Sequence, residues 1–164
     1  LTLAVADHRG LLLYQGDALS RYDGRSAEVT RVIDGDTLVV DLPDAGSTTT
    51  RIRLWGIDTP EMADPDTGRP AEPLARRARQ VAQQLASNKT VTLELEAHRV
   101  RGDFGRVLAH VHLPDGTNLA ERLLKRGLAE FDDRYRHRYF RRYRIVTQQA
   151  QTRNLGLWQK RDDR

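Results

Sequence analysis

The sequence predicts a β-rich α+β domain, in which five strands close into a small barrel with a helix after the third strand and two C-terminal helices. Three observations lead to this fold class. The first half of the chain has three short segments of alternating polar and apolar residues, separated by turn residues. A helical pattern precedes two further alternating segments, and two more helical patterns follow them. At 164 residues, the chain is large enough to fold around one core without disulfides or a structural metal.

Turn residues mark the boundaries of the first three strands. These strands are expected at residues 29–33, 38–42 and 50–54. Asp34 and Gly35 separate the first two, and Asp-Gly is strongly favoured in tight hairpin turns. A second turn at residues 43–46 leads into the third strand. Four of the six prolines then fall between residues 60 and 73, which predicts a loop of defined shape.

The second half of the chain supplies the helices and the last two strands. The expected elements are a helix over 74–85, strands over 91–96 and 107–111, and helices over 119–124 and 139–153. Asn88, Gly127 and Asn154 follow the helical patterns and are typical helix stops. Five short strands with a helix after the third fit a closed barrel of the OB type. We expect this domain at residues 27–160, after an N-terminal extension (1–26) of unknown role and before a short tail (161–164).

Composition excludes several classes of protein. The chain has no cysteine, which excludes disulfide scaffolds, thiol catalysis and zinc sites built on thiolates. Its 27 basic and 23 acidic residues give a net charge of +4. Six arginines lie between residues 134 and 144, and without that stretch the acidic residues outnumber the basic ones. The protein is therefore a near-neutral body with one basic segment, not a uniformly basic nucleic-acid coat.

The N-terminus and the hydropathy pattern bear on location. No apolar run reaches the roughly 18–20 residues of a membrane span, so we expect no stable span, and we expect a monomer. Residues 1–6 are apolar and end in a small-x-small pattern. They match either the remnant of a signal or anchor segment or an ordinary N-terminal stretch, and we favour the latter.

Two acidic residues stand where strands give way to turns. Asp36 follows the first hairpin turn, and Asp58 is expected at the end of the third strand. Pro60 biases Thr59 toward extended backbone, which presents the Thr59 carbonyl outward. Carboxylate and carbonyl oxygens are the ligands that Ca²⁺ prefers, so Asp36, Asp58 and Thr59 form a partial calcium site. Ordinary turn chemistry explains each aspartate alone, but explains their recurrence at adjacent strand ends less well.

Arginines and a third acid complement this site. Arg53 lies on the third strand and Arg106 opens the fifth. Guanidinium groups match phosphate oxygens, and together with a metal they favour cleavage of phosphodiesters. Glu61, three residues after Asp58, is placed to act as the general base for a water molecule. The alternative for the two arginines is a pair of structural ion pairs.

Four segments carry a resemblance to a known family. They are Ile-Asp-Gly-Asp-Thr at 33–37, Arg-Leu-Trp-Gly-Ile-Asp-Thr-Pro-Glu at 53–61, Asp-Phe-Gly-Arg at 103–106 and Asn-Leu-Gly-Leu-Trp at 154–158. They resemble the signature segments of the staphylococcal nuclease (thermonuclease) family, in the same order and with similar separations. The resemblance covers about residues 27–160, and four ordered matches are far more specific than one.

The resemblance implies both an activity and residue roles. It implies an OB-type barrel with a calcium-dependent phosphodiesterase that cuts DNA and RNA on the 5′ side of the phosphate, leaving 3′-phosphate ends. The positions that match are Asp36 and Asp58 as calcium carboxylates, Thr59 as carbonyl ligand, Glu61 as water-activating carboxylate, and Arg53 and Arg106 as phosphate-binding arginines. Binding-only modules of the family typically lose several of these. Because many members are secreted, a secreted or membrane-anchored extracytoplasmic location is favoured.

One region departs from the family pattern. Tyr135 matches one of two aromatic residues that stack on the nucleotide, whereas Asp133 replaces the other. Residues 134–144 interleave arginines with aromatics, which predicts nucleic-acid binding by Tyr135, Arg134, Arg136 and Arg138. The alternative is that Phe140, Tyr143 and Val146 face the barrel while the arginines project into water.

Two further interpretations stay open at this point. His110 and His112 share one face of the fifth strand, but without an evident third ligand a structural role is favoured over a metal site. The alternative to an enzyme is a non-catalytic OB-fold module that binds nucleic acid or protein.

Overall fold

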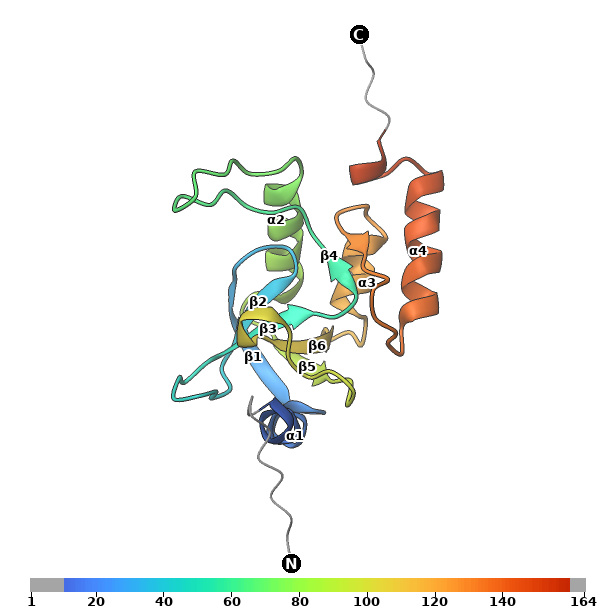
Figure 1. Ribbon diagram of the computed structural model, residues 1–164. Coiled ribbons are helices and arrows are strands. Elements are labelled where there is room, and N and C mark those ends of the chain that lie inside the picture. The colour runs from blue at the N-terminus through green and yellow to red at the C-terminus, as the bar shows by residue number, and fades with distance from the viewer. Residues whose placement is uncertain (1–10, 160–164) are drawn as a thin grey trace, which may run out of the picture.

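Five strands close into a barrel in the computed structural model, which describes residues 11–159 (Figure 1). The strands are β1 (Ser26–Val32), β2 (Thr37–Val40), β3 (Thr50–Leu54), β5 (Thr90–Glu94) and β6 (Val107–His112). Their order around the barrel is β1-β2-β3-β6-β5. β3 and β6 pair in parallel, whereas the other neighbours are antiparallel. The predicted five-stranded OB-type barrel is confirmed.

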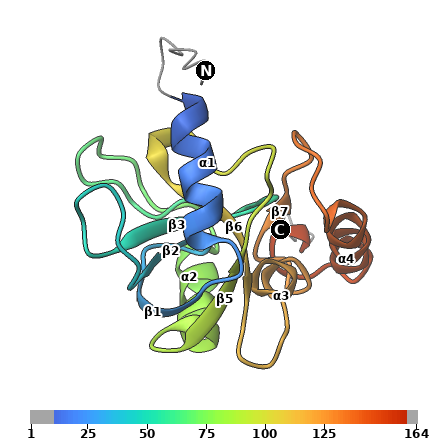
Figure 2. The ribbon, with the colours of Figure 1, turned by 90° about the horizontal axis from the view of Figure 1, so that it is seen from below.

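Three helices occupy the predicted places. They are α2 (Ala75–Ala86) after the third barrel strand, α3 (Leu119–Leu124) and α4 (Phe140–Thr152). The apolar stripe of α2 is buried against the barrel, as its helical periodicity predicts. α3 and α4 lie together on one side of the barrel (Figures 1 and 2). On α4, Phe140, Tyr143 and Val146 are buried, so the structural interpretation of these side chains is confirmed.

A helix that the sequence did not predict covers another part of the barrel. α1 (Leu11–Tyr22) lies against the end of the barrel opposite to α2 (Figures 1 and 2). Ala18 and Tyr22 are fully buried in the main core. The Tyr22 hydroxyl donates a hydrogen bond to the carbonyl of Pro43 at 2.8 Å. Part of the N-terminal extension is therefore packed against the core.

The third strand has the predicted bounds, but Asp58 does not lie on it. β3 ends at Leu54, and Gly56 turns the chain with a φ of 71°. Asp58 then lies on a separate two-residue strand, β4 (Ile57–Asp58), which pairs with β7 (Glu130–Phe131). The placement of Asp58 at the end of the third strand was therefore wrong. Short 3-10 turns, η1 (Asp103–Gly105) and η2 (Gly156–Trp158), complete the elements.

The connection from β1 to β2 also differs from the predicted tight turn. The last pair before the connection is Val32 with Leu38, so the loop is longer than the two residues Asp-Gly. Gly35 is not among the glycines with positive φ. A Cβ at Gly35 would lie 2.8 Å from Thr59 Cγ2 and 2.9 Å from Ala78 Cβ. Glycine is needed here because other segments approach closely, not because of the turn conformation.

The sequence also led to predictions about a membrane span and about the two ends of the chain. Between residues 11 and 159, none of the helices is long and apolar enough to cross a membrane. The apolar stretch at residues 1–6 and the tail at residues 161–164 lie outside the described residues.

Candidate active site

Asp36 is the buried centre of the candidate site. Asp36 is only 2% exposed and directly precedes β2. Oδ2 accepts hydrogen bonds from the backbone nitrogen (2.8 Å) and the hydroxyl (2.9 Å) of Thr59. Oδ1 accepts one from the Thr37 hydroxyl at 3.1 Å and forms an ion pair with Arg53. These contacts tie the segment after β4 to the start of β2, although the two are far apart in the sequence.

Arg53 bridges the two aspartates. It lies on β3 opposite Thr37 of β2, and its side chain is only 14% exposed. Its guanidinium forms ion pairs with Asp36 and with Asp58, the latter at 2.6 Å. It also donates a hydrogen bond to the carbonyl of Ile57 at 3.1 Å. The predicted carboxylates therefore converge on one positive group.

Arg106 reaches the same place from the neighbouring strand. It directly precedes β6, which lies beside β3 in the barrel. Nη1 donates to the Thr37 hydroxyl and Nε to the Asp103 carbonyl, both at 3.4 Å. Burial, and then the nearby charge of Arg53, lower the pKa of Arg106. The group stays charged near neutral pH because the ordinary arginine pKa is so high.

Asp34 is a member of this cluster that the sequence reasoning missed. Oδ1 of Asp34 accepts a hydrogen bond from the backbone nitrogen of Asp36 at 3.0 Å. Burial raises the pKa of Asp34, while bonding to Thr37 and the charge of Arg53 oppose this shift. The signal was present in the sequence as a second acid two residues before Asp36, but it was assigned to turn formation alone.

Glu61 lies at the edge of the cluster, in the proline-rich loop. Its side chain is 47% exposed and forms an ion pair with Arg69 at 3.5 Å. Its backbone is fixed by two hydrogen bonds with Glu72, each 2.9 Å long. The charge of Glu61 acts on Arg106 in the direction that raises its pKa, so the two groups are within electrostatic reach. Glu61 is both open to water and within electrostatic reach of Arg106.

The residues present suit a hard cation. The Asp36 and Asp58 carboxylates already contact one guanidinium, so both can face one positive charge. With the Thr59 carbonyl they would make a donor set of oxygens alone, the kind that suits calcium. Among the described residues, no group of three or more histidine, aspartate or glutamate side chains is arranged to hold a metal. A cation here would therefore depend on the carbonyl and on water for its remaining ligands.

Two clefts adjoin Arg53 and Asp58. The first, of about 80 Å³, is lined by both arginines and by Trp55, Arg99, Arg134 and Tyr135, among others. The second, of about 720 Å³, is lined by Asp58, Thr59, Pro60, Glu72, Glu130 and Leu157, among others. The cleft with the two arginines is cationic and partly aromatic, whereas the larger one is acidic and apolar.

Comparison with known proteins identifies the family. The family model described as "Staphylococcal nuclease homologue" matches residues 51–160. The chain belongs to the staphylococcal nuclease family. It is 34% identical over 144 residues to "Thermonuclease" of Staphylococcus intermedius, covering 84% of this chain and 78% of that protein. It is 32% identical over 147 residues to "Thermonuclease" of Staphylococcus hyicus, covering 88% and 82%. It is 33% identical over 132 residues to "Endonuclease YncB" of Bacillus subtilis (strain 168), covering 79% and 60%.

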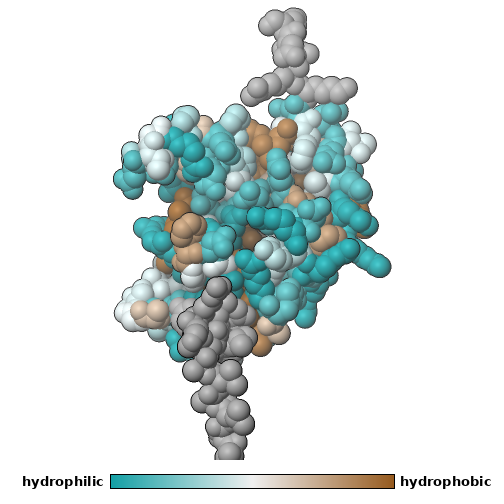
Figure 3. All heavy atoms as spheres, viewed as in Figure 1, coloured by the Kyte–Doolittle hydropathy of each residue, from teal (hydrophilic) through white to brown (hydrophobic). Residues whose placement is uncertain are grey.

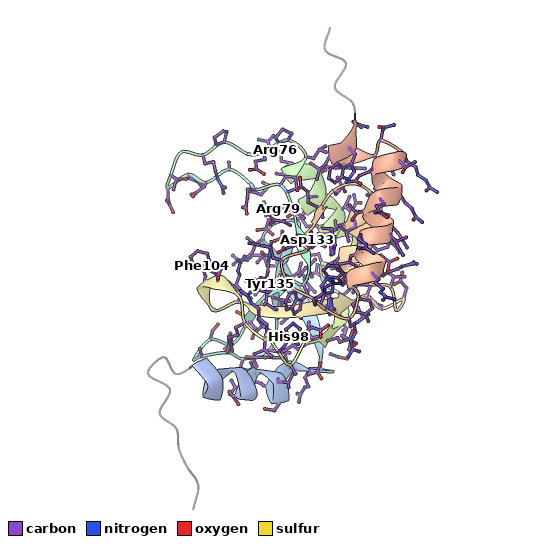
Figure 4. All side chains as sticks on the ribbon, turned by 45° about the vertical axis from the view of Figure 1, so that its right-hand side comes forward. Arg76, Arg79, His98, Phe104, Asp133 and Tyr135 are labelled. Atoms are coloured by element: carbon purple, nitrogen blue, oxygen red, sulfur yellow. The ribbon has the colours of Figure 1, made fainter. Side chains whose placement is uncertain are left out.

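In this member of the staphylococcal nuclease family, only part of the predicted nucleic-acid surface reaches the arginine-lined cleft. Tyr135 and Arg134 line it. Tyr135 is 42% exposed, with the Arg99 guanidinium 4.0 Å from its ring centroid. Arg134 forms an ion pair with Asp132 at 2.7 Å. Asp133, at the position where the family pattern has an aromatic residue, is exposed nearby (Figure 4).

Arg136 and Arg138 do not line that cleft. Arg136 lies over the ring of Phe140, 4.1 Å from its centroid. Arg138 forms an ion pair with Glu94, and its backbone nitrogen donates to Glu96 at 2.7 Å. Both arginines therefore have structural contacts, while their side chains remain at the surface.

Proposed function

We propose that the chain is a calcium-dependent phosphodiesterase that hydrolyses DNA, RNA or both on the 5′ side of the phosphate. The single observation that carries this proposal is the convergence of Arg53, Asp36 and Asp58, with Arg106 lining the same cleft as Arg53. Its relatives named thermonuclease and endonuclease support the same activity.

Metal binding and phosphate binding fall to different residues in this proposal. Asp36, Asp58 and the Thr59 carbonyl would hold calcium, which when bound supplies positive charge next to the phosphate and a site for water. Arg53 and Arg106 donate hydrogen bonds to the phosphate oxygens and stabilise the charge that develops on them. Because Arg53 is largely and Arg106 partly removed from solvent, these interactions are stronger than they would be in water.

Glu61 acts as the general base in this proposal. It accepts a proton from a water molecule as the water oxygen forms a bond to phosphorus. The bond between phosphorus and the 5′ oxygen breaks, and that oxygen leaves as a hydroxyl after gaining a proton from solvent. The products are a 3′-phosphate end and a 5′-hydroxyl end. The exposure of Glu61 suits this role because the attacking water has to reach it.

The nucleotide next to the cleaved bond would lie over the arginine-lined cleft. There Tyr135 can stack on a base, which contributes about 1–3 kcal/mol per base. Arg134 would add positive charge at the same edge, and Arg136 and Arg138 would contact more distant phosphates. With Asp133 beside Tyr135, binding rests on one aromatic residue instead of two.

The test is cleavage of single-stranded DNA and RNA by the purified protein, with calcium and with a chelator. We expect cleavage that chelation abolishes and calcium restores. Glu61→Gln is expected to lower kcat by about 10²–10⁴-fold, the usual contribution of a general base. Glu28→Gln, which makes the same change on the exposed outer face of β1, is the matched control and should leave kcat unchanged.

Three outcomes contradict the proposal. One is cleavage that is insensitive to chelation, and another is equal activity of the Glu61 and Glu28 variants. The third is salt-sensitive binding without cleavage, which would favour a non-catalytic binding module instead.

A further inference from the structure

Arg76 and Arg79 form an unpaired basic face on α2. They lie three residues apart, so their side chains project from the same side of the helix, with Cβ atoms about 5–6 Å apart. Figure 4 shows both on the part of α2 nearest its first turns, above Asp133 and Tyr135 in that view. Neither forms an ion pair or hydrogen bond with any residue between 11 and 159. Such arginines have donors available for a ligand.

Arg79 has a buried donor without an acceptor. Its Nε is shielded from solvent and has no hydrogen-bond partner within the part of the chain that the structure describes. An unsatisfied buried donor next to a positive charge is unfavourable, and such groups usually mark a missing partner. An anionic oxygen is the partner that satisfies both the donor and the charge.

A groove lies on this face of α2. It has a volume of about 410 Å³ and is lined by Met62, Arg76, Arg79, Gln80 and Gln83. All of these lining residues are basic, amide or apolar, and none is acidic. Met62 directly follows Glu61 in the chain. One residue that lines the groove is therefore the chain neighbour of the proposed general base.

α2 also contacts the site directly. Ala78, between the two arginines in the sequence, lies against the loop that carries Asp36, since a Cβ on Gly35 would be 2.9 Å from Ala78 Cβ. A Cβ at that position would also touch Thr59. Arg79 therefore follows a residue that packs on the proposed calcium-binding segment. A strand leaving the site over Met62 would enter the groove that Arg76 and Arg79 line.

We propose that Arg76 and Arg79 bind a backbone phosphate of the nucleic acid strand beyond the phosphate that is cleaved. This proposal rests on the proposed function and adds a second phosphate-binding position to it. Planar guanidinium forks match phosphate oxygens, and the amides of Gln80 and Gln83 can donate hydrogen bonds to the same backbone. Most of the face seen in Figure 3 is hydrophilic.

Arg77 provides a matched control on the same helix. Its charge contributes to lowering the pKa of Arg126, just after α3, so Arg77 lies on a different side of α2. Arg77 does not line the groove. Arg79→Gln and Arg77→Gln remove the same charge from nearby positions and replace it with the same good helix former.

The first experiment measures binding of a labelled oligothymidylate of about 8–12 nucleotides, within the span of an OB fold. Fluorescence anisotropy follows binding across a salt titration, with calcium and in the Glu61→Gln background to prevent cleavage. Loss of one phosphate contact lowers the magnitude of the negative slope of log K against log salt by about 0.7 for a single strand. We expect part of that loss for Arg79→Gln, the whole of it for Arg76→Gln combined with Arg79→Gln, and a smaller change for Arg77→Gln. Arg79→Lys should restore most of the slope because it keeps the charge.

The second experiment distinguishes phosphate binding by Arg76 and Arg79 from the cleavage step itself. In the background that retains Glu61, Arg79→Gln should raise KM several-fold for the oligonucleotide with kcat unchanged. KM for a dinucleotide with a single phosphodiester should not change, since that substrate has no second phosphate. Equal salt slopes for the Arg79 and Arg77 variants, or an equal rise in KM on the dinucleotide, would overturn the inference. Absence of cleavage by the unsubstituted protein would overturn the proposed function, while the salt slopes would still report on Arg79.

Discussion

We expect the protein to lose stability in mild acid because His110 is buried in its neutral form. His110 is fully buried on β6 beneath α4, where Nδ1 lies 3.3 Å from the hydroxyl of Tyr143 and Nε2 lies 3.2 Å from Oε1 of Glu96. Burial lowers the pKa of His110 to about 3, and the neighbouring His137 acts in the same direction. The pKa of His137 is itself lowered by burial, to about 4. The neutral form of both rings is therefore the one that the fold accommodates.

The direction and size of the effect follow from proton linkage. The folded-state pKa of His110 lies below its ordinary value of 6.5, so the unfolded chain takes up the proton first as the pH falls. The stabilisation is fully present above about pH 6.5 and is lost progressively toward about pH 3. Between about pH 7.5 and pH 4.5 the loss is about 2.5 kcal/mol for this histidine, at about 1.36 kcal/mol per pKa unit. That is a large part of the ~5–15 kcal/mol by which domains are stable.

The assay is urea unfolding of the protein and of His110→Gln across this pH range. Glutamine is neutral at every pH and can hydrogen-bond to both Tyr143 and Glu96. The carboxylates whose pKa values the fold lowers, such as Glu94, lose their contribution only at lower pH. We therefore expect the difference in free energy of unfolding between the two proteins to shrink by about 2.5 kcal/mol from about pH 7.5 to 4.5.

The matched control is His112→Gln, a change on the same strand that leaves His110 in place. This variant should retain the pH dependence that His110 contributes. Parallel stability curves for the protein and for His110→Gln would refute the reasoning, because they would mean that His110 binds its proton equally well in both states.

Two further predictions concern packing. Gly35→Ala should destabilise the fold by about 1–3 kcal/mol, as overpacked sites do, because its Cβ would press on Thr59 and Ala78. Urea unfolding checks this value, and a neutral result would mean that the two segments can separate. Tyr22→Ala should lower stability by about 3–5 kcal/mol, the usual range for removing a buried aromatic ring. Thermal unfolding checks this value, and a change below about 1 kcal/mol would show that α1 does not belong to the core.

The hydrophobic periodicity of the sequence was sufficient to predict the longer helices and strands of the fold. The helix expected at 74–85 is α2, Ala75–Ala86, because its apolar stripe recurs at helical spacing. β4 and β7 are two residues each, which is too short for any periodic signal. α1 contains Gly16, which is unfavourable within a helix, and its position depends on contacts such as that of Tyr22 with Pro43.

The candidate site was predictable as a set of residue types, but not as a set of contacts. The acids and arginines stand at strand ends in the sequence, whereas their pairing follows from the barrel, which sets β3 between β2 and β6. The arginine-rich stretch at residues 134–144 also makes contacts that the local sequence does not predict. Arg138 contacts Glu94 only because the segment before α4 lies beside the end of β5, and no local sequence pattern predicts a partner 44 residues away.

The ion pairs of Arg53 with two aspartates bear on how the site could bind a phosphate. Under the proposed function, Arg53 has to receive a phosphate while it already lies between Asp36 and Asp58. A phosphate next to two unneutralised carboxylates would be repelled, so the site needs additional positive charge before it can hold substrate. The same carboxylates are the proposed calcium ligands, and their neutralisation would release donors of Arg53 toward the phosphate. Arg106, whose two hydrogen bonds are both long at 3.4 Å, gives up little when it turns to the substrate. The two arginines are therefore unequal, because Arg53 organises the acids and Arg106 is the freer donor.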